Sequence, residues 1–206
     1  MSKIVDKVIR GAKVVSGSAI TEACVAVDGE LIVAVGDELV MPAAREVVDA
    51  SGLYLLPGAI DSHVHFRDPG YPHKETWRSG SAAAACGGVT TVFEMPNTKP
   101  ATTTVELLHD KLQRAAGRAH SDFAFFLGAS AQNADHLGEW EQTPGCAGVK
   151  VFMGSSTGDL LVPDDPTVER VLRSGKRRVA VHAEDDYRLK ERYAALKPGT
   201  HVRQHG

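Results

Sequence analysis

Hydrophobic and polar positions follow two different patterns along this chain, and the pattern changes near Leu56-Pro57-Gly58. Before that point, short β-branched runs alternate with turns, and Asp28-Gly29 stands between two of these runs. An Asp-Gly pair in that position indicates a β-hairpin, because its type I′ turn requires positive φ. We therefore expect residues 1–56 to form a small β module, the N-terminal part of a composite β domain, with a structural role.

From residue 57 onward, apolar runs of strand length alternate with helical stretches. In the clearest helix, Val105, Leu108 and Leu112 form one apolar stripe, and Gly117 follows as a stop signal. The predicted strands are 59–64, 89–94, 123–127, 148–153 and 178–182. The predicted helices are 75–86, 104–116, 134–141, 166–173 and 185–196. Such alternation indicates βαβ units and a parallel sheet.

The length of this second region restricts the fold. Its about 150 residues give roughly 30 for each strand-helix unit, close to the ~31 of an eight-unit (β/α)8 barrel. Five units do not close that barrel, so the sequence is compatible with an open doubly wound sheet or with a chain that stops before the fold is complete. The ending, Lys197 to Gly206, lacks an apolar closing element. We therefore expect an α/β fold in which 57–206 forms the first five βα units of a TIM barrel.

Composition narrows the classes of function. The chain has 206 residues, 43% hydrophobic and 24% charged, and its formal net charge of -3 gives no electrostatic case for nucleic acid. No apolar run reaches the ~18 residues of a membrane span, and the first residues lack the apolar core of a secretion signal, so we expect a cytoplasmic protein. Cys24, Cys86 and Cys146 lie far apart without CxxC spacing, which indicates neither a disulfide framework nor a zinc knuckle.

Candidate metal ligands lie at or near the ends of predicted strands. His63 and His65 are two apart, so a strand would point both imidazoles to one face. His182 ends another run, and Lys150 lies inside a third, where an unpaired ammonium would be costly to bury. A lysine binds metal only when deprotonated or converted to a carbamate, which can bridge two cations suited to amide hydrolysis. Alternatively, Lys150 is a snorkelling side chain with its head in water.

Four segments closely resemble the dihydroorotases of the amidohydrolase superfamily, and the motifs are specific as a set. They are GAIDSHVHFRDPG, KETWRSGSAAAACGGVTTVFEMPNTKP, GVKVFMGSSTG and VAVHAEDD. The resemblance runs from the β module to about Leu196. It implies two Zn²⁺ ions, with His63 and His65 as ligands of the more buried metal, Lys150 as a carboxylated bridging ligand and His182 as a ligand of the more exposed metal.

The resemblance also implies that Arg67 and Asn97 hold a substrate carboxylate. A planar guanidinium suits a carboxylate, and Asn97 follows the second predicted strand of the barrel. The alternative for Arg67 is a salt bridge to Asp68 or Glu75. For Asn97 it is a helix cap or a turn residue.

The function that the resemblance implies is reversible hydrolysis of dihydroorotate to N-carbamoyl-aspartate in pyrimidine biosynthesis, through a metal-bridged hydroxide. The family pattern adds a histidine on strand six and an acid/base Asp on strand eight, beyond the five strands found. We therefore expect the 206-residue chain alone to be inactive and to be completed by further sequence, a complementing chain or a homodimer. The alternatives are an allantoinase or hydantoinase, and a non-catalytic scaffold that binds aspartate transcarbamoylase.

Overall fold

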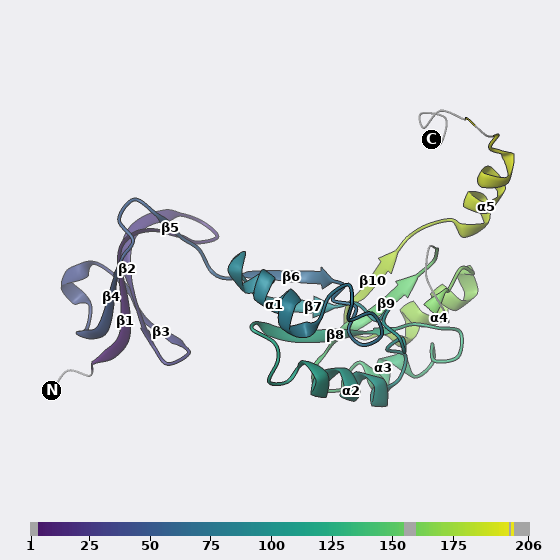
Figure 1. The fold of residues 1–206 in the computed structure, drawn as a ribbon, viewed down its shortest axis with the longest axis horizontal. Coiled ribbons are helices and arrows are strands. Elements are labelled where there is room, and N and C mark those ends of the chain that lie inside the picture. The colour runs from purple at the N-terminus through teal and green to yellow at the C-terminus, as the bar shows by residue number, and fades with distance from the viewer. Residues whose placement is uncertain (1–3, 155–159, 198, 200–206) are drawn as a thin grey trace. The chain divides into compact units, whose positions relative to one another are not determined.

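The computed structural model describes residues 4–154, 160–197 and 199. Most of the GSSTG sequence at 154–158 and the end of the chain from residue 200 lie outside the described residues. The chain divides into two compact units, Met1–Gly58 and Ala59–Gly206, each described by itself (Figure 1). Within the described residues, no helix is long and apolar enough to cross a membrane.

The first unit is a five-stranded sheet, β3-β2-β1-β4, with β5 also paired to β1. Strands β1, β2 and β3 are antiparallel neighbours, whereas β4 and β5 run parallel to β1. Its small core consists of Val5, Val8, Cys24 and Ala26. The elements are β1 (Val5–Val15), β2 (Ile20–Asp28), β3 (Leu31–Gly36), the short 3-10 helix η1 (Glu38–Val40), β4 (Ala44–Asp49) and β5 (Tyr54–Leu55).

The predicted hairpin joins β2 to β3, but its turn lies one residue later than expected. Asp28 still pairs with Leu31, so the two loop residues are Gly29 and Glu30. Of these two, Gly29 alone has positive φ, at 59°. A glycine at the first loop position followed by a residue with negative φ is the type II′ pattern, so the expected type I′ turn is wrong.

The second unit is a parallel sheet in which the strands follow one another in chain order, β10-β9-β8-β7-β6 (Figure 1). A doubly wound sheet reverses its strand order at a switch point, whereas a barrel wall does not. The predicted half-barrel is therefore confirmed and the open doubly wound alternative is wrong. Its strands are β6 (Ala59–Val64), β7 (Val89–Glu94), β8 (Asp122–Gly128), β9 (Cys146–Phe152) and β10 (Val179–His182).

Each predicted helix of this unit is present, and only one differs by more than two residues at an end. The helices are α1 (Trp77–Cys86), α2 (Val105–Ala115), α3 (Leu137–Trp140), α4 (Asp165–Ser174) and α5 (Asp186–Ala195). Helix α3 begins three residues later than predicted. The reason is local, because Asn133 accepts a hydrogen bond from the Ser130 amide and donates to two carbonyls, which favours a turn over a helix.

Alternation along the central strands separates the face of the sheet that joins the apolar core from the opposite face. Leu127, Val149 and Val151 belong to one buried cluster with residues of the helices, among them Trp77, Leu108, Leu137 and Val171. Lys150 stands between Val149 and Val151, so its side chain leaves the opposite face of the sheet. In a closed barrel that face is the interior.

Helix α1 packs directly on the segment that follows the paired histidines. Thr76 begins the helix with a capping box that includes Ser79. Phe66 meets Trp77 edge to face, with ring centroids 5.1 Å apart. A Cβ at Gly80 would lie 2.6 Å from Cδ1 of Phe66, so glycine is what allows this close approach.

Candidate functional site at the carboxyl ends of the parallel strands

The histidine pair lies where β6 ends. His63 is in the strand and His65 follows it directly. Their ring centroids are 5.2 Å apart with 54° between the planes, so both rings occupy the same side of the chain. The His63 amide donates to Oδ1 of Asp61 at 3.0 Å, which fixes the backbone just before the pair.

Asn97 reaches this pair from the neighbouring strand end. Its Oδ1 lies 2.7 Å from Nδ1 of His65. An amide oxygen only accepts, so Nδ1 carries the ring proton and Nε2 keeps its lone pair. Metal-binding histidines are commonly oriented by such a partner. The helix-cap alternative for Asn97 is wrong, because Thr104 caps α2 through the Leu107 amide.

Both imidazoles are biased toward the neutral form. Partial burial and the charge of Lys150 lower the pKa of His63. Burial is also the first cause that lowers the pKa of His65, and the hydrogen bond with Asn97 raises it; the charges of Arg67, His63 and Lys150 lower it further. A neutral imidazole is the form that ligates a metal.

Lys150 is buried, with only 2% of its surface exposed, so the snorkelling alternative is wrong. Its Nζ lies 4.9 Å from the centre of the Phe152 ring. In the part of the chain that the structure describes, Lys150 forms no salt bridge. Burial lowers the pKa of its ammonium and so favours the free amine, the form from which a carbamate is made.

The contacts of His182 are with Glu184 and Phe152 rather than with the histidine pair. Its Nε2 lies 3.0 Å from Oε1 of Glu184, and its ring centroid is 6.1 Å from that of Phe152. Its charge nevertheless contributes to the lowered pKa of His63. Among the described residues, no group of three or more His, Cys, Asp or Glu side chains lies close enough to hold a metal ion. Thus His63 and His65 lie together at the end of β6, the charge of Lys150 acts on both imidazoles, and His182 contacts Glu184.

Arg67 has an unusual backbone for its residue type. Its φ is 63°, and no other non-glycine residue in the described ranges has a positive φ. That conformation costs a non-glycine residue about 1–2 kcal/mol. Arg67 forms no ion pair with a described residue, so the predicted alternative of a salt bridge to Asp68 or Glu75 is wrong.

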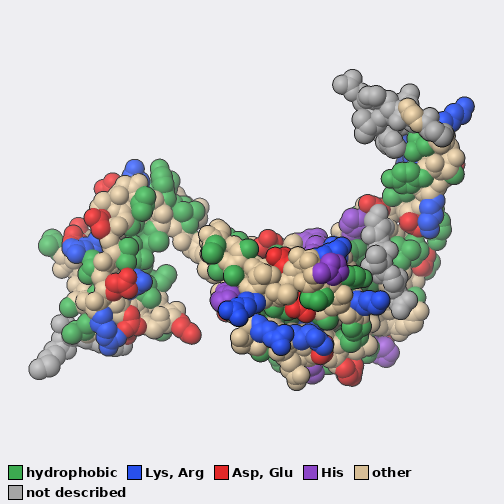
Figure 2. Space-filling model, in the orientation of Figure 1, with side chains coloured by type: hydrophobic (Ala, Val, Ile, Leu, Met, Phe, Trp, Pro, Cys, Tyr) green, Lys and Arg blue, Asp and Glu red, His purple; other side chains and the backbone are tan. Residues whose placement is uncertain are grey.

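Figure 2 shows Lys and Arg side chains and histidines gathered on the surface of the second unit.

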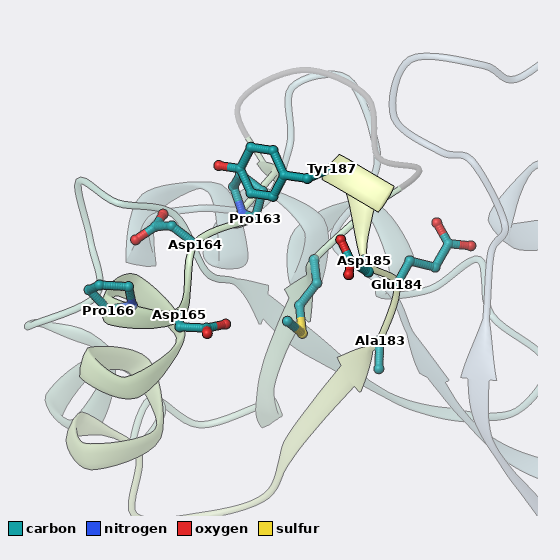
Figure 3. A pocket seen from close by; sticks show the side chains of 9 residues that line it. Pro163, Asp164, Asp165, Pro166, Ala183, Glu184, Asp185 and Tyr187 are labelled. Atoms are coloured by element: carbon teal, nitrogen blue, oxygen red, sulfur yellow. The ribbon is translucent and has the colours of Figure 1, made fainter. Parts of the chain in front are cut away.

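A pocket of about 600 Å³ opens beyond the ends of β9 and β10 (Figure 3). Its wall carries four carboxylates, Asp164, Asp165, Glu184 and Asp185, together with Tyr187. Asp164 and Asp185 cap α4 and α5 by accepting backbone amides, so two of the four have structural roles. An acidic wall repels an anion, which makes the neighbourhood of Arg67 the better place for a negatively charged group.

One buried polar pair lies outside the residues predicted from the sequence. Glu94 ends β7 and forms a salt bridge with Lys111 of α2, and both side chains are fully buried. Burial raises the pKa of Glu94 to about 7, an effect that the Lys111 charge opposes. A signal was present in the sequence, because Lys111 is three residues after Leu108 and four before Ala115, on the buried face of the helix.

Comparison with known proteins gives a consistent picture. Residues 52–130 match the family model described as dihydro-orotase-like. The chain is 40% identical over 185 residues to an allantoinase of Rubrobacter xylanophilus, covering 87% of this chain and 40% of that protein. It is 41% identical over 166 residues to a dihydroorotase of Halobacterium salinarum, covering 77% of this chain and 37% of that protein.

Solved structures extend the likeness to the fold. The L-hydantoinase (dihydropyrimidinase) from Arthrobacter aurescens superposes with a TM-score of 0.83 at 27% identity, covering 93% of this chain and 44% of that one. A dihydropyrimidinase from Brevibacillus agri gives 0.77 at 34% identity, covering 92% and 43%. The chain thus spans about two fifths of the length of the relatives it matches.

Proposed function

This chain belongs to the amidohydrolase family, with residues 52–130 matching the dihydro-orotase-like family model, and from that premise we propose that the protein carrying it hydrolyses dihydroorotate. The names of its relatives support the activity of a cyclic amidohydrolase. The observation that carries the choice of substrate is Arg67, which has a strained backbone, forms no ion pair with a described residue and acts through its charge on the ring of His65. A cation held beside a candidate metal ligand suits a cyclic amide that carries a carboxylate.

We propose that the metal is held by His63, His65 and Lys150, with His182 as ligand of a second ion, and that both ions are zinc. The donor chemistry fits, because the two imidazoles are biased toward neutrality and Lys150 lacks a carboxylate partner among the described residues. His182 would exchange its contact with Glu184 for this role. A bound divalent cation would polarise the amide carbonyl as a Lewis acid and would lower the pKa of a bound water, and both effects favour amide hydrolysis.

Arg67 and Asn97 divide the work of orienting the substrate. Because Oδ1 of Asn97 faces the His65 ring, its Nδ2 remains as the donor for a carboxylate. The guanidinium of Arg67 supplies a second, planar donor. Holding the carboxylate at two points fixes which ring carbonyl faces the histidine pair.

The test compares three substrates with the protein that carries this chain. We expect kcat/KM for dihydroorotate to exceed that for allantoin and for hydantoin. Arg67→Met is expected to lower kcat/KM for dihydroorotate by about 10²-fold and for hydantoin, which has no carboxylate, by far less. Arg78→Met, on the exposed side of α1, is the matched control and should change neither.

Allantoin is the second candidate substrate, because an allantoinase is as similar in sequence as a dihydroorotase. A preference for allantoin or hydantoin over dihydroorotate would overturn the proposed substrate and leave the cyclic amidohydrolase assignment intact.

A further inference from the structure

We propose that the buried ion pair of Glu94 and Lys111 is a positioning device for the His63-Val64-His65 segment, acting through the backbone of Met95. The proposal rests on the proposed function insofar as these histidines bind metal. It concerns two residues that form no hydrogen bond or ion pair with either histidine and that fill no role in the chemistry described above.

The pair is unusual in its burial. Glu94 is 0% exposed and Lys111 1% exposed, and Nζ of Lys111 lies 5.1 Å from the centre of the Phe125 ring. Desolvating two charges is costly, and apolar side chains of similar volume often stabilise a core at least as well. A contribution to core stability therefore explains the presence of this pair poorly. The hydrogen bond that Lys111 donates outside the pair explains it better.

Two successive hydrogen bonds connect Lys111 to the histidine segment. Lys111 Nζ donates to the carbonyl of Met95 at 3.2 Å. The Met95 amide in turn donates to the carbonyl of Val64 at 3.0 Å, and Val64 stands between His63 and His65. The backbone of Met95 thus joins the buried lysine to the centre of the histidine segment.

The same segment also holds the histidine ring. Two residues after Met95, Asn97 places Oδ1 against Nδ1 of His65 at 2.7 Å. The stretch 95–97 therefore contacts the histidine segment twice, once at its backbone and once at a ring. The hydrogen bond from Lys111 fixes the Met95 carbonyl. Because Pro96 has a fixed φ, few backbone torsions separate Met95 from Asn97, so this bond limits the movement of both contacts with the histidine segment.

The charges on the loop after β6 act on the same acid. Asp68 and Arg67 both influence the ionisation of Glu94, after the larger effects of burial and Lys111. The buried pair is thus electrostatically coupled to the residue proposed to hold the substrate carboxylate.

The experiment replaces the pair by neutral side chains of similar shape, Glu94→Gln with Lys111→Met. Removing both charges together avoids leaving one charge buried alone, which is the more damaging change. The first readout is ¹⁵N-histidine NMR of the metal-free chain, where the His65 Nδ1 proton reports the Asn97 contact. The second is Co²⁺ affinity, followed by visible absorption. We expect the double variant to fold, to lose the protected Nδ1 proton and to bind Co²⁺ about tenfold more weakly.

The matched control is Glu141→Gln. Glu141 is also fully buried and accepts the Arg177 amide at 2.9 Å, but it lies near the starts of β9 and β10, at the other end of the strands. We expect this variant to lower the melting temperature and to leave both readouts unchanged. The charge-conserving double variant Glu94→Asp with Lys111→Arg should keep the Nδ1 proton.

A parent-like Nδ1 proton together with parent-like Co²⁺ affinity in the neutral double variant would overturn the proposal. If that variant does not fold, Lys111→Met alone, studied at pH 6 where Glu94 is largely protonated, answers the same question with the same readouts. Failure of the parent itself to bind Co²⁺ would count against the proposed function, and the NMR comparison on metal-free chains would still decide the positioning role.

Discussion

Oδ1 of Asn97 lies 2.7 Å from Nδ1 of His65, so the loop after β7 fixes a ring that follows β6. The two residues are 32 positions apart in sequence and meet because parallel neighbours bring their carboxyl ends to the same edge of the sheet. The contact selects the tautomer of His65 in which Nε2 is free to bind a metal.

Asn97→Ala should therefore weaken metal binding by about 10-fold to 100-fold, because His65 loses the partner that sets its tautomer and orientation. Co²⁺ titration followed by visible absorption measures this directly. His136→Gln is the control, since His136 stacks on Trp140 with centroids 5.2 Å apart and makes no contact with the pair. An unchanged Co²⁺ affinity in Asn97→Ala would show that the contact does not serve metal binding.

Lys150→Met should stabilise the metal-free chain by about 1 kcal/mol, because it removes a buried ammonium that has no carboxylate partner among the described residues. That corresponds to a rise in melting temperature of roughly 2–4 °C. The same variant should abolish hydrolysis in the protein that carries this chain. The exposed Lys99→Met is the control and should stay within about 0.5 kcal/mol of the parent. A lower melting temperature for Lys150→Met would reveal a stabilising role that the contacts do not show.

Glu94 should make the stability of the chain depend on pH. Its pKa is raised to about 7 from 4.5, by burial against the opposing effects of Lys111 and Arg67 and with a contribution from Asp68. Because the folded state holds the proton more tightly, this stabilising contribution is complete below about pH 4.5 and is lost as the pH rises through about 7. The slope is at most ~1.4 kcal/mol per pH unit.

Urea unfolding between pH 4.5 and 7.5 measures this dependence, with Glu94→Gln as the comparison. The variant should lack the fall that Glu94 causes in the parent. Equal slopes in parent and variant would show that Glu94 titrates as it does in the unfolded chain.

Gly80→Ala should destabilise the chain, against the usual sign for a helix. In an exposed helix the change gains up to about 1 kcal/mol, but here the new Cβ would lie 2.6 Å from Cδ1 of buried Phe66. Overpacking of this kind costs about 1–3 kcal/mol. Urea unfolding should show a net loss that Phe66→Leu partly relieves in the double variant. The exposed Ala83→Gly control should lose only the propensity difference, about 1 kcal/mol.

The sequence by itself determined the elements of the second unit and the identity of most candidate site residues. Apolar runs bounded by Gly and Pro set the five strands, and the period of two along a strand put His63 and His65 on one side. The same alternation places Lys150 on the face of the sheet opposite to the apolar core, to which Val149 and Val151 belong.

The tertiary structure alone decided which of these residues meet. Asn97 orients His65, Lys111 faces Glu94, and Arg67 adopts a left-handed backbone. The local pattern places Lys111 on the buried face of α2 but does not indicate its partner, and it does not distinguish Asn97 from a cap or Arg67 from a member of an ordinary ion pair. The physical reason is that hydrophobic periodicity reports which face of one element is buried. Contacts between polar side chains depend instead on how neighbouring elements align, and that is fixed only when the strands pair and the helices pack against them.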